Sequence, residues 1–188
     1  MPPLIELILG GQKSGKSRAA EARALSWLAT VGHEAVLLAT ATPGDAEMRE
    51  RIARHQMDRA ARVPRLQTVE ESHDLAGALR DGSKPQRLII VDCLTLWLTQ
   101  RAMPLNGTPA SPQDLRAATD ALVRAAVAAP GPIVFVSNEI GLGISPLTAE
   151  VRWFVDVLGL LHQQIGAVCH RVTLMVAGCE LAVRSAAP

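Results

Sequence analysis

The chain has 188 residues, about the size of one ordinary domain, which is enough for one substantial hydrophobic core. Its 19 Lys and Arg nearly balance 18 Asp and Glu, and the formal charge of +1 argues against a nucleic-acid backbone as the main partner. With 48% hydrophobic and 20% charged residues the chain should fold, and its two Phe, three Trp and no Tyr offer little for stacking on bases.

The opening segment is predicted to be a strand over residues 4–9. It has no basic region before its apolar run, and Glu6 lies within that run, so it does not resemble a signal peptide. Nowhere does an uncharged apolar run approach the roughly 20 residues that a membrane span needs. We therefore expect a cytoplasmic protein with no membrane span and no nucleic-acid partner.

Along the rest of the chain, short apolar runs alternate with longer amphipathic stretches. Further strands are expected at 35–40, 87–92, 133–137 and 172–176. Helices are expected at 16–30, 45–62, 72–80, 112–128 and 148–168, the fourth of them capped by Ser111 with Asp114 three residues on. Apolar strands that alternate with helices are typical of a mostly parallel sheet covered by helices on both faces. We therefore predict one α/β domain over residues 1–188.

The three cysteines, Cys93, Cys169 and Cys179, are widely spaced and form no C-x-x-C pair. A disulfide framework or a zinc site would need closer or paired spacing. We expect all three to be free thiols packed in the core.

A glycine-rich segment directly after the first expected strand fits the P-loop pattern G-x-x-x-x-G-K-[ST] at every fixed position. Glycines let successive backbone N–H groups point at phosphate oxygens, and the following helix adds the positive end of its dipole. Lys16 can reach the β- and γ-phosphates, and the Ser17 hydroxyl can ligate Mg²⁺. The expected nucleotide-binding residues are Gly10, Gly11, Gln12, Lys13, Ser14, Gly15, Lys16 and Ser17. The motif predicts a RecA-like P-loop NTPase domain.

A second carboxylate is expected at the end of a neighbouring buried strand, where P-loop enzymes hold the metal ion directly or through water. Asp92 follows the apolar residues 88–91 and has this position. The sequence contains no N-K-x-D tetrapeptide, which switch GTPases use to recognise guanine, so a regulatory G protein is not expected.

An arginine-rich helix is expected at 45–62, and six of the chain's arginines fall within residues 45–65. Helical spacing places Met48, Ile52, His55 and Arg59 on one stripe, so we expect His55 to point inward or into a cleft. The pattern by itself favours a core histidine, and a functional one is the alternative. The other four histidines are expected to be structural or at the surface, the last two of them in the last helix: His33, His73, His162 and His170.

The expected strand 133–137 runs into a polar and glycine-rich loop over residues 137–146. Loops at the carboxyl ends of parallel strands are where open α/β sheets bind ligands. A substrate loop is therefore predicted, and a flexible connection is the alternative. Its candidate residues are Asn138, Glu139, Gly141 and Gly143.

Together these segments resemble the bifunctional adenosylcobinamide kinase / adenosylcobinamide-phosphate guanylyltransferase family of cobalamin biosynthesis. The resemblance covers nearly the whole chain. Its most diagnostic part is Ser137–Pro146, which is similar to the family's (T/S)-N-E-(V/I)-G-x-G-(I/V)-x-P. The other similar segments are 4–17, 38–41, 45–55, 68–71 and 90–95.

The resemblance implies that the enzyme phosphorylates the aminopropanol hydroxyl of adenosylcobinamide, with ATP or GTP as the donor. It then implies transfer of GMP from GTP to that phosphate through a guanylyl-histidine, with His55 at the matching position. A homo-oligomer such as a trimer is also implied. Further nucleotide contacts are expected from Thr40, Ala41, Thr42, Gln56, Arg59, Glu70 and Asp92.

Some positions depart from the family pattern. Gln56 stands where the family often has a basic residue, and Leu66 stands near its usual tryptophan. The stretch 59–68 is also a few residues longer than is usual in the family. The sequence therefore does not decide which residues cradle the triphosphate. Two other functions are considered, namely a P-loop kinase with a single activity on a small molecule and a RecA-like ATPase module that acts on a polymer or protein.

Overall fold

The computed structural model describes residues 3–42, 44 and 46–185, apart from the side chains of residues 47, 48 and 51. Over these residues the chain forms seven strands and six helices. In chain order they are β1 (Ile5–Gly10), α1 (Lys16–Leu28), β2 (Glu34–Ala39), α2 (Ala46–Arg62), β3 (Leu66–Glu70), α3 (Leu75–Gly82), β4 (Arg87–Asp92), α4 (Leu94–Ala102), α5 (Pro112–Ala128), β5 (Ile133–Asn138), α6 (Ala149–Val168), β6 (Arg171–Val176) and β7 (Cys179–Arg184).

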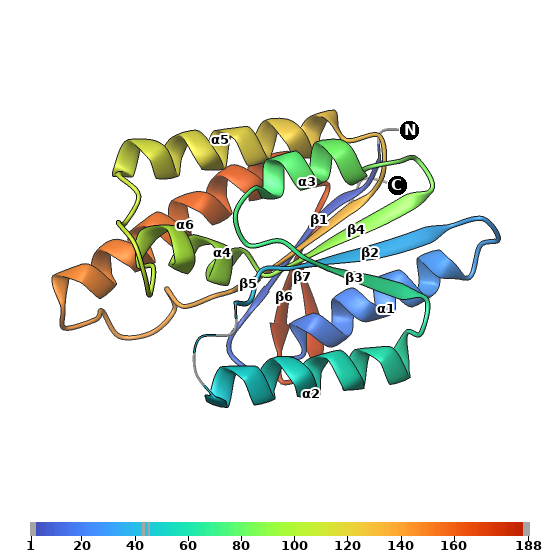
Figure 1. The fold of residues 1–188 in the computed structure, drawn as a ribbon, viewed down its shortest axis with the longest axis horizontal. Coiled ribbons are helices and arrows are strands. Elements are labelled where there is room, and N and C mark those ends of the chain that lie inside the picture. The colour runs from blue at the N-terminus through green and yellow to red at the C-terminus, as the bar shows by residue number, and fades with distance from the viewer. Residues whose placement is uncertain (1–2, 43, 45, 186–188) are drawn as a thin grey trace.

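The described strands form one sheet in the order β3-β2-β4-β5-β1-β6-β7. The strands from β3 to β6 in this order are parallel, and β7 pairs antiparallel with β6 at one edge. Figure 1 shows α1 and α2 on one face of the sheet and α3, α4, α5 and α6 on the other. The predicted mostly parallel sheet with helices on both faces is confirmed.

Each face of the sheet has its own hydrophobic core. Along β1, Leu7 belongs to the core under α3 to α6, and the next residue, Ile8, belongs to the core under α1. Val91 and Ile90 alternate in the same way along β4. Since successive side chains of a strand point to opposite faces, a sheet covered on both sides needs strands that are apolar throughout.

The five expected strands and five expected helices are all present with small shifts at their ends, and Ser111 and Asp114 form the expected capping box. Residue 45, the expected start of the second helix, lies outside the described residues. Sequence analysis missed β3, β7 and α4. β3 and β7 are edge strands with mostly exposed residues, so they lack the apolar run of a central strand, and α4 has only 9 residues.

All three cysteines are free thiols, as predicted, and two of them pack in the core. Cys93 and Cys169 are buried free thiols, and burial raises the pKa of each to about 12. Cys179 is exposed, which corrects the prediction that it packs in the core. It opens β7, the antiparallel edge strand, whose residues are all exposed. None of the described helices is both long and apolar enough to cross a membrane.

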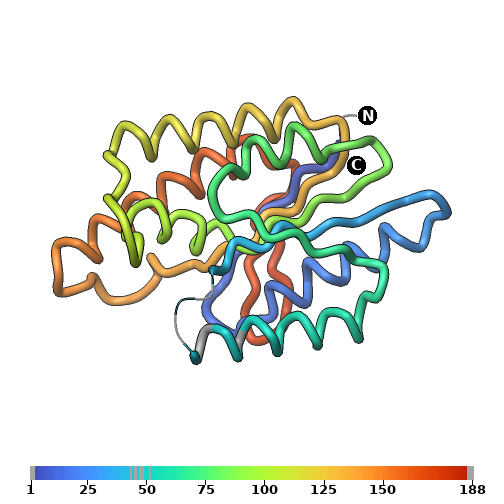
Figure 2. Tube along the Cα trace, viewed as in Figure 1, coloured from blue at the N-terminus to red at the C-terminus, as the bar shows by residue number. Residues whose placement is uncertain are grey.

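The segments predicted to bind nucleotide and substrate all lie at the carboxyl ends of the parallel strands. The chain path in Figure 2 leaves β1, β4 and β5 on the same side of the sheet. Strand register places Glu70, Ala39 and Asp92 in one row across β3, β2 and β4. Gly10 at the end of β1 pairs with Asn138 at the end of β5. The predicted nucleotide and substrate loops therefore leave the sheet side by side.

A buried ion pair ties α1 to the sheet behind this edge. Glu6 in β1 is fully buried, and both of its carboxylate oxygens accept hydrogen bonds of 3.1 Å from Arg23 of α1. Thr173 of β6 donates a third, at 3.0 Å. Arg23 also donates to Glu180 of β7 at 2.7 Å. One guanidinium thus links a helix, a central strand and the edge strand.

Arg23→Ala is expected to lower the free energy of unfolding by about 3 kcal/mol or more, because it leaves the buried Glu6 carboxylate without its main partner. Denaturant unfolding measures this loss. Arg80→Ala is the matched control, since the Arg80–Asp74 pair is exposed and spans 4.0 Å. That control should cost less than about 1 kcal/mol. Equal losses in the two variants would contradict the role given to the buried pair.

Candidate active site

The loop between β1 and α1 has the geometry of a phosphate cradle. Gly10 has φ +152°, and a Cβ there would lie 2.5 Å from the backbone oxygen of Met175. Gly15 has φ +105° and serves as the N-cap of α1. Side chains are strained at both positions, so the glycines of the motif are required by the backbone and by the close approach of β6.

Hydrogen bonds to backbone carbonyls of the loop fix its conformation. Lys16 is 8% exposed, and its Nζ donates to the Gly11 carbonyl at 2.6 Å. The amide of Gly178, in the turn between β6 and β7, donates to the Ser14 carbonyl at 3.0 Å. Ser14 Oγ is buried and finds no hydrogen-bond partner among the described residues. Gly11, Gln12 and Lys13 are exposed, so the backbone of the loop can receive an anion at the N-terminus of α1.

Asp92 and Ser17 meet beside this loop. The Ser17 hydroxyl donates to Asp92 Oδ2 at 3.1 Å. Burial raises the pKa of the Asp92 carboxyl, against the lowering effects of Arg59, of the Ser17 hydrogen bond, of His55 and of Lys16. Three basic side chains, one from the P-loop and two from α2, therefore act on a single carboxylate.

The hydroxyl and the carboxylate fit a magnesium ion. Mg²⁺ is commonly held by one or two protein oxygens together with water and substrate phosphates. Within the described part of the chain, no group of three or more His, Cys, Asp and Glu is placed to hold a metal on its own. A P-loop site does not need such a group, because the nucleotide supplies the other ligands.

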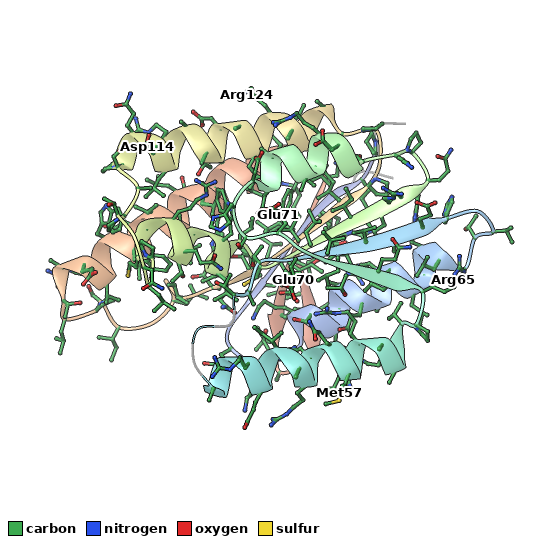
Figure 3. All side chains as sticks on the ribbon, in the orientation of Figure 1. Met57, Arg65, Glu70, Glu71, Asp114 and Arg124 are labelled. Atoms are coloured by element: carbon green, nitrogen blue, oxygen red, sulfur yellow. The ribbon has the colours of Figure 1, made fainter. Side chains whose placement is uncertain are left out.

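His55 does not point inward, the first of the two predicted orientations; its side chain is exposed. The buried member of the expected stripe is Arg59, whose side chain is 8% exposed, while Ile52 is half-buried. The side chain of Met48 lies outside the described residues. Figure 3 shows Met57 on the outer surface of α2, turned away from the sheet.

The reason for this orientation is that α2 docks on α1 through charges. Arg62 donates twice to the Glu21 carboxylate, at 2.6 and 3.1 Å, and Arg59 Nε lies 3.8 Å from the same group. Arg59 also donates to Thr68 Oγ1 at 3.2 Å. The C-terminal half of α2 is held by these contacts, and His55 stays on the accessible part of the helix near Asp92.

The three residues after β2 differ in how accessible they are to a ligand. Thr40 is buried, and its hydroxyl both donates to the Cys93 carbonyl at 2.8 Å and accepts from the Cys93 amide at 2.7 Å. Gln100 donates to the Thr40 carbonyl at 2.5 Å. Thr40 therefore braces the turn after Asp92, while Ala41 is half-buried and Thr42 is exposed. Nucleotide contacts from these three residues stay a prediction.

Two other predicted nucleotide contacts are exposed. Glu70 ends the edge strand β3, where it pairs with Ala39 at the end of β2, and Figure 3 labels it there. Gln56 follows His55 on α2. Both are accessible to a ligand, and their contacts with it stay predictions.

The predicted substrate loop begins against the P-loop. The Glu139 amide donates to the Gly10 carbonyl at 3.0 Å, and Glu139 Oε1 accepts from the Gly141 amide at 2.6 Å. A pocket of about 210 Å³ opens beside this turn. Its lining includes Gly143 and, from α6, Arg152 and Asp156.

Sequence analysis missed a polar cluster behind this loop. His162 Nε2 lies 2.7 Å from the Ser137 hydroxyl, which lies 3.0 Å from the Thr95 hydroxyl. His162 belongs to α6, as expected, but it faces the site, whereas His170 follows the helix and its Nδ1 accepts from the Ile5 amide. No motif joins these residues; only the spacing of α6 against β5 brings them together.

A model of the family described as cobinamide kinase / cobinamide phosphate guanyltransferase matches residues 6–183. A bifunctional adenosylcobalamin biosynthesis protein, CobP, of Pseudomonas aeruginosa is 44% identical over 95% of this chain and 96% of its own length. The protein of the same description, CobU, of Escherichia coli is 30% identical over 95% of this chain and 98% of its own. The crystal structure of the flagellar accessory protein FlaH of Methanocaldococcus jannaschii superposes with a TM-score of 0.52 at 11% identity, over 98% of this chain and 80% of that one.

The likeness to FlaH concerns the fold alone. Together with the mostly parallel sheet and the P-loop between β1 and α1, it defines a P-loop protein with an α/β fold of this type, as predicted. Within that class, the match over residues 6–183 and the 44% identity show that the chain belongs to the cobinamide kinase / cobinamide phosphate guanyltransferase family. The resemblance inferred from the sequence is confirmed.

Proposed function

We propose that the chain phosphorylates the aminopropanol hydroxyl of adenosylcobinamide and then transfers GMP from GTP to that phosphate, which gives adenosylcobinamide-GDP. Membership of a family with these two activities supports the proposal. The observation that carries it is geometric: the P-loop opens α1, and α2, which carries His55, docks on α1 through the two hydrogen bonds of 2.6 and 3.1 Å from Arg62 to Glu21. One nucleotide site can then serve both transfers.

For the kinase step, the P-loop amides and Lys16 hold the β- and γ-phosphates of ATP or GTP. Ser17 and Asp92 are the residues that would hold Mg²⁺, which when bound neutralises charge on the phosphates. The substrate hydroxyl attacks the γ-phosphorus, its O–P bond forms, and the bond to the nucleoside diphosphate breaks. Orientation and positive charge do most of the catalysis in such a transfer.

For the second step, we assign the nucleophile to His55. An imidazole nitrogen attacks the α-phosphorus of GTP, so that an N–P bond forms and pyrophosphate leaves. The phosphate oxygen of the first product then attacks the same phosphorus, which breaks the N–P bond and restores the imidazole. Arg54 and Arg59 lie one residue before and one turn after His55 on α2, where they can stabilise the phosphate charges.

Labelled GTP tests the proposal on the purified chain. If His55 carries GMP, ³²P from α-labelled GTP stays on the denatured chain, and ³²P from γ-labelled GTP does not. Retention of neither label would favour the alternative with a single activity, a kinase that moves only the γ-phosphoryl group. Hydrolysis of ATP that is stimulated by a polymer and not by adenosylcobinamide would favour the RecA-like ATPase module.

We further propose a cytoplasmic homo-oligomer, with a trimer as the assembly to test. The support is the family membership, and light scattering on the eluting protein measures the mass directly. A mass near 20.0 kDa, that of one chain, would contradict this part of the proposal.

A further inference from the structure

A chain of side-chain hydrogen bonds links α6 to the end of β5. The His162 side chain is 9% exposed, and its Nε2 lies 2.7 Å from Ser137 Oγ. Ser137 is fully buried, and its hydroxyl lies 3.0 Å from Thr95 Oγ1. Thr95 Oγ1 in turn accepts a hydrogen bond of 2.8 Å from the Asn138 amide. The chain ends at the residue before Glu139.

The direction of these bonds follows from counting hydrogens. Thr95 Oγ1 already accepts the Asn138 N–H, so its own hydrogen has the Ser137 oxygen as acceptor. Ser137 then donates to His162 Nε2, which places the hydrogen of the neutral ring on Nδ1. The reverse direction would leave the Thr95 hydrogen with no acceptor among the contacts of the described residues. Burial lowers the pKa of His162, against the raising effect of Glu139, in keeping with a neutral ring.

The Nδ1 atom faces the predicted substrate loop. It lies 3.8 Å from Glu139 Oε2, just beyond hydrogen-bond length, and contacts of this kind in unliganded active sites often tighten when the substrate binds. The other carboxylate oxygen of Glu139 is held by the Gly141 amide, and the Glu139 amide is held by Gly10 at the base of the P-loop. Glu139 is 22% exposed, beside the pocket of about 210 Å³.

We propose that Glu139 accepts the proton of the hydroxyl that is phosphorylated, and that His162 is its positioning residue, oriented by Ser137 and Thr95. This inference rests on the proposed kinase function. The Glu139 amide is bonded to Gly10 at the base of the P-loop, and its carboxylate is bonded to the amide of Gly141, which lines the pocket that would receive the aminopropanol arm. The position of Glu139 is set by three elements, namely β1, the turn at Gly141 and α6.

Every bond, proton and electron pair in the proposed step is accounted for. The hydroxyl oxygen bonds to the γ-phosphorus as the bond from phosphorus to the bridging oxygen breaks, and the hydroxyl proton moves to Glu139. The nucleoside diphosphate leaves with the electron pair of the broken bond, and Glu139 later returns its proton to water. His162 does not exchange a proton in this step; its N–H would hold the carboxylate in line once the gap of 3.8 Å closes to hydrogen-bond length.

Glu139→Gln is expected to lower the kcat of adenosylcobinamide phosphorylation by about a hundredfold or more, because an amide cannot accept the proton. The melting temperature should change little, since the amide oxygen can still accept from the Gly141 amide. Phosphorylation at the wild-type rate would overturn the assignment of Glu139. A large loss of melting temperature with a normal kcat in the folded fraction would make the loop structural.

Two substitutions at His162 separate the contribution of each nitrogen. In His162→Asn the side-chain amide overlies Nδ1, so the donor toward Glu139 is kept and kcat should stay within about threefold of wild type. In His162→Gln the amide overlies Nε2, so the contact with Ser137 is kept and the donor is lost; kcat should fall about tenfold or more. Both variants should keep the KM for the nucleotide. Gln164→Ala, at an exposed position of α6, is the control and should match wild type.

The result that overturns the role of His162 is an equal kcat in the Asn and Gln variants, or a larger loss in Asn. If His162→Gln does not fold, Ser137→Ala replaces it, since it removes the group that orients the ring and should lower kcat with an unchanged nucleotide KM. Failure of the underlying function looks different. Wild-type protein that does not phosphorylate adenosylcobinamide would overturn the proposed kinase and this inference together, whatever the variants do.

Discussion

Lys16→Ala is expected to lower kinase turnover by about a hundredfold or more and to weaken nucleotide binding. Lys16 Nζ now lies against the Gly11 carbonyl inside the loop, 2.6 Å away, where the β- and γ-phosphates of a nucleotide would lie. Alanine removes this positive charge and keeps the helix, because alanine is the best helix former. Calorimetric titration and steady-state kinetics measure the two effects.

Lys84→Ala is the matched control for the loss of a lysine. Lys84 is exposed and precedes β4, at the opposite end of the sheet from the P-loop, so its removal should leave both quantities unchanged.

Asp92→Asn tests the metal separately: it should raise the Mg²⁺ concentration for half-maximal activity by about tenfold or more. Full kinase activity in both the Lys16 and the Asp92 variants at saturating Mg²⁺ would show that catalysis lies elsewhere.

The arrangement of the P-loop beside Asp92 was predictable because its parts are local in sequence. Residues 10–17 follow a strand directly and carry every fixed position of one motif. Predicting the position of Asp92 required only one further rule, namely that the carboxyl ends of parallel strands lie at the same edge of the sheet. The structure joins the two parts through the bond of 3.1 Å from Ser17 to Asp92.

The orientation of α2 was not predictable from its own residues. Helical spacing favoured an inward His55, but the helix docks through Arg59 and Arg62 on Glu21, a residue of α1 that lies 41 positions before Arg62. A periodic pattern of apolar residues identifies a face that packs by burial, and it does not identify a face held by ion pairs. The partner was visible only in the fold.

The same limit explains why His162 was assigned to the structural histidines. Its partners lie 25 positions away, at Ser137, and further back at Thr95. Ser137 and Thr95 lie in two separate segments that resemble the family, and nothing in either segment points to His162. Edge strand β7 was missed for a related reason, since its exposed residues have no apolar run and its pairing with β6 is decided by the turn at Gly178.

His55→Ala is expected to abolish the retention of ³²P from α-labelled GTP and to lower guanylyl transfer by about 10⁴-fold or more, as loss of a nucleophile does. The exposed imidazole has no substitute in the proposed N–P bond. Kinase activity should persist, because transfer of the γ-phosphoryl group needs the P-loop, Lys16 and Asp92 and no covalent histidine. Filter binding of denatured protein and a coupled kinase assay measure the two activities on one preparation.

The adduct itself carries a second signature. A phosphoramidate on histidine is labile in acid and stable in base, which distinguishes it from an ester on serine. His73→Ala is the matched control: His73 is also exposed but lies before α3, away from α2, so its loss should leave labelling intact. Labelling that survives His55→Ala, or an adduct that maps to His73, would remove His55 from the mechanism. Loss of kinase and labelling together in His55→Ala, with an unchanged melting temperature, would instead mean that His55 contributes to both reactions and is not specific to guanylyl transfer.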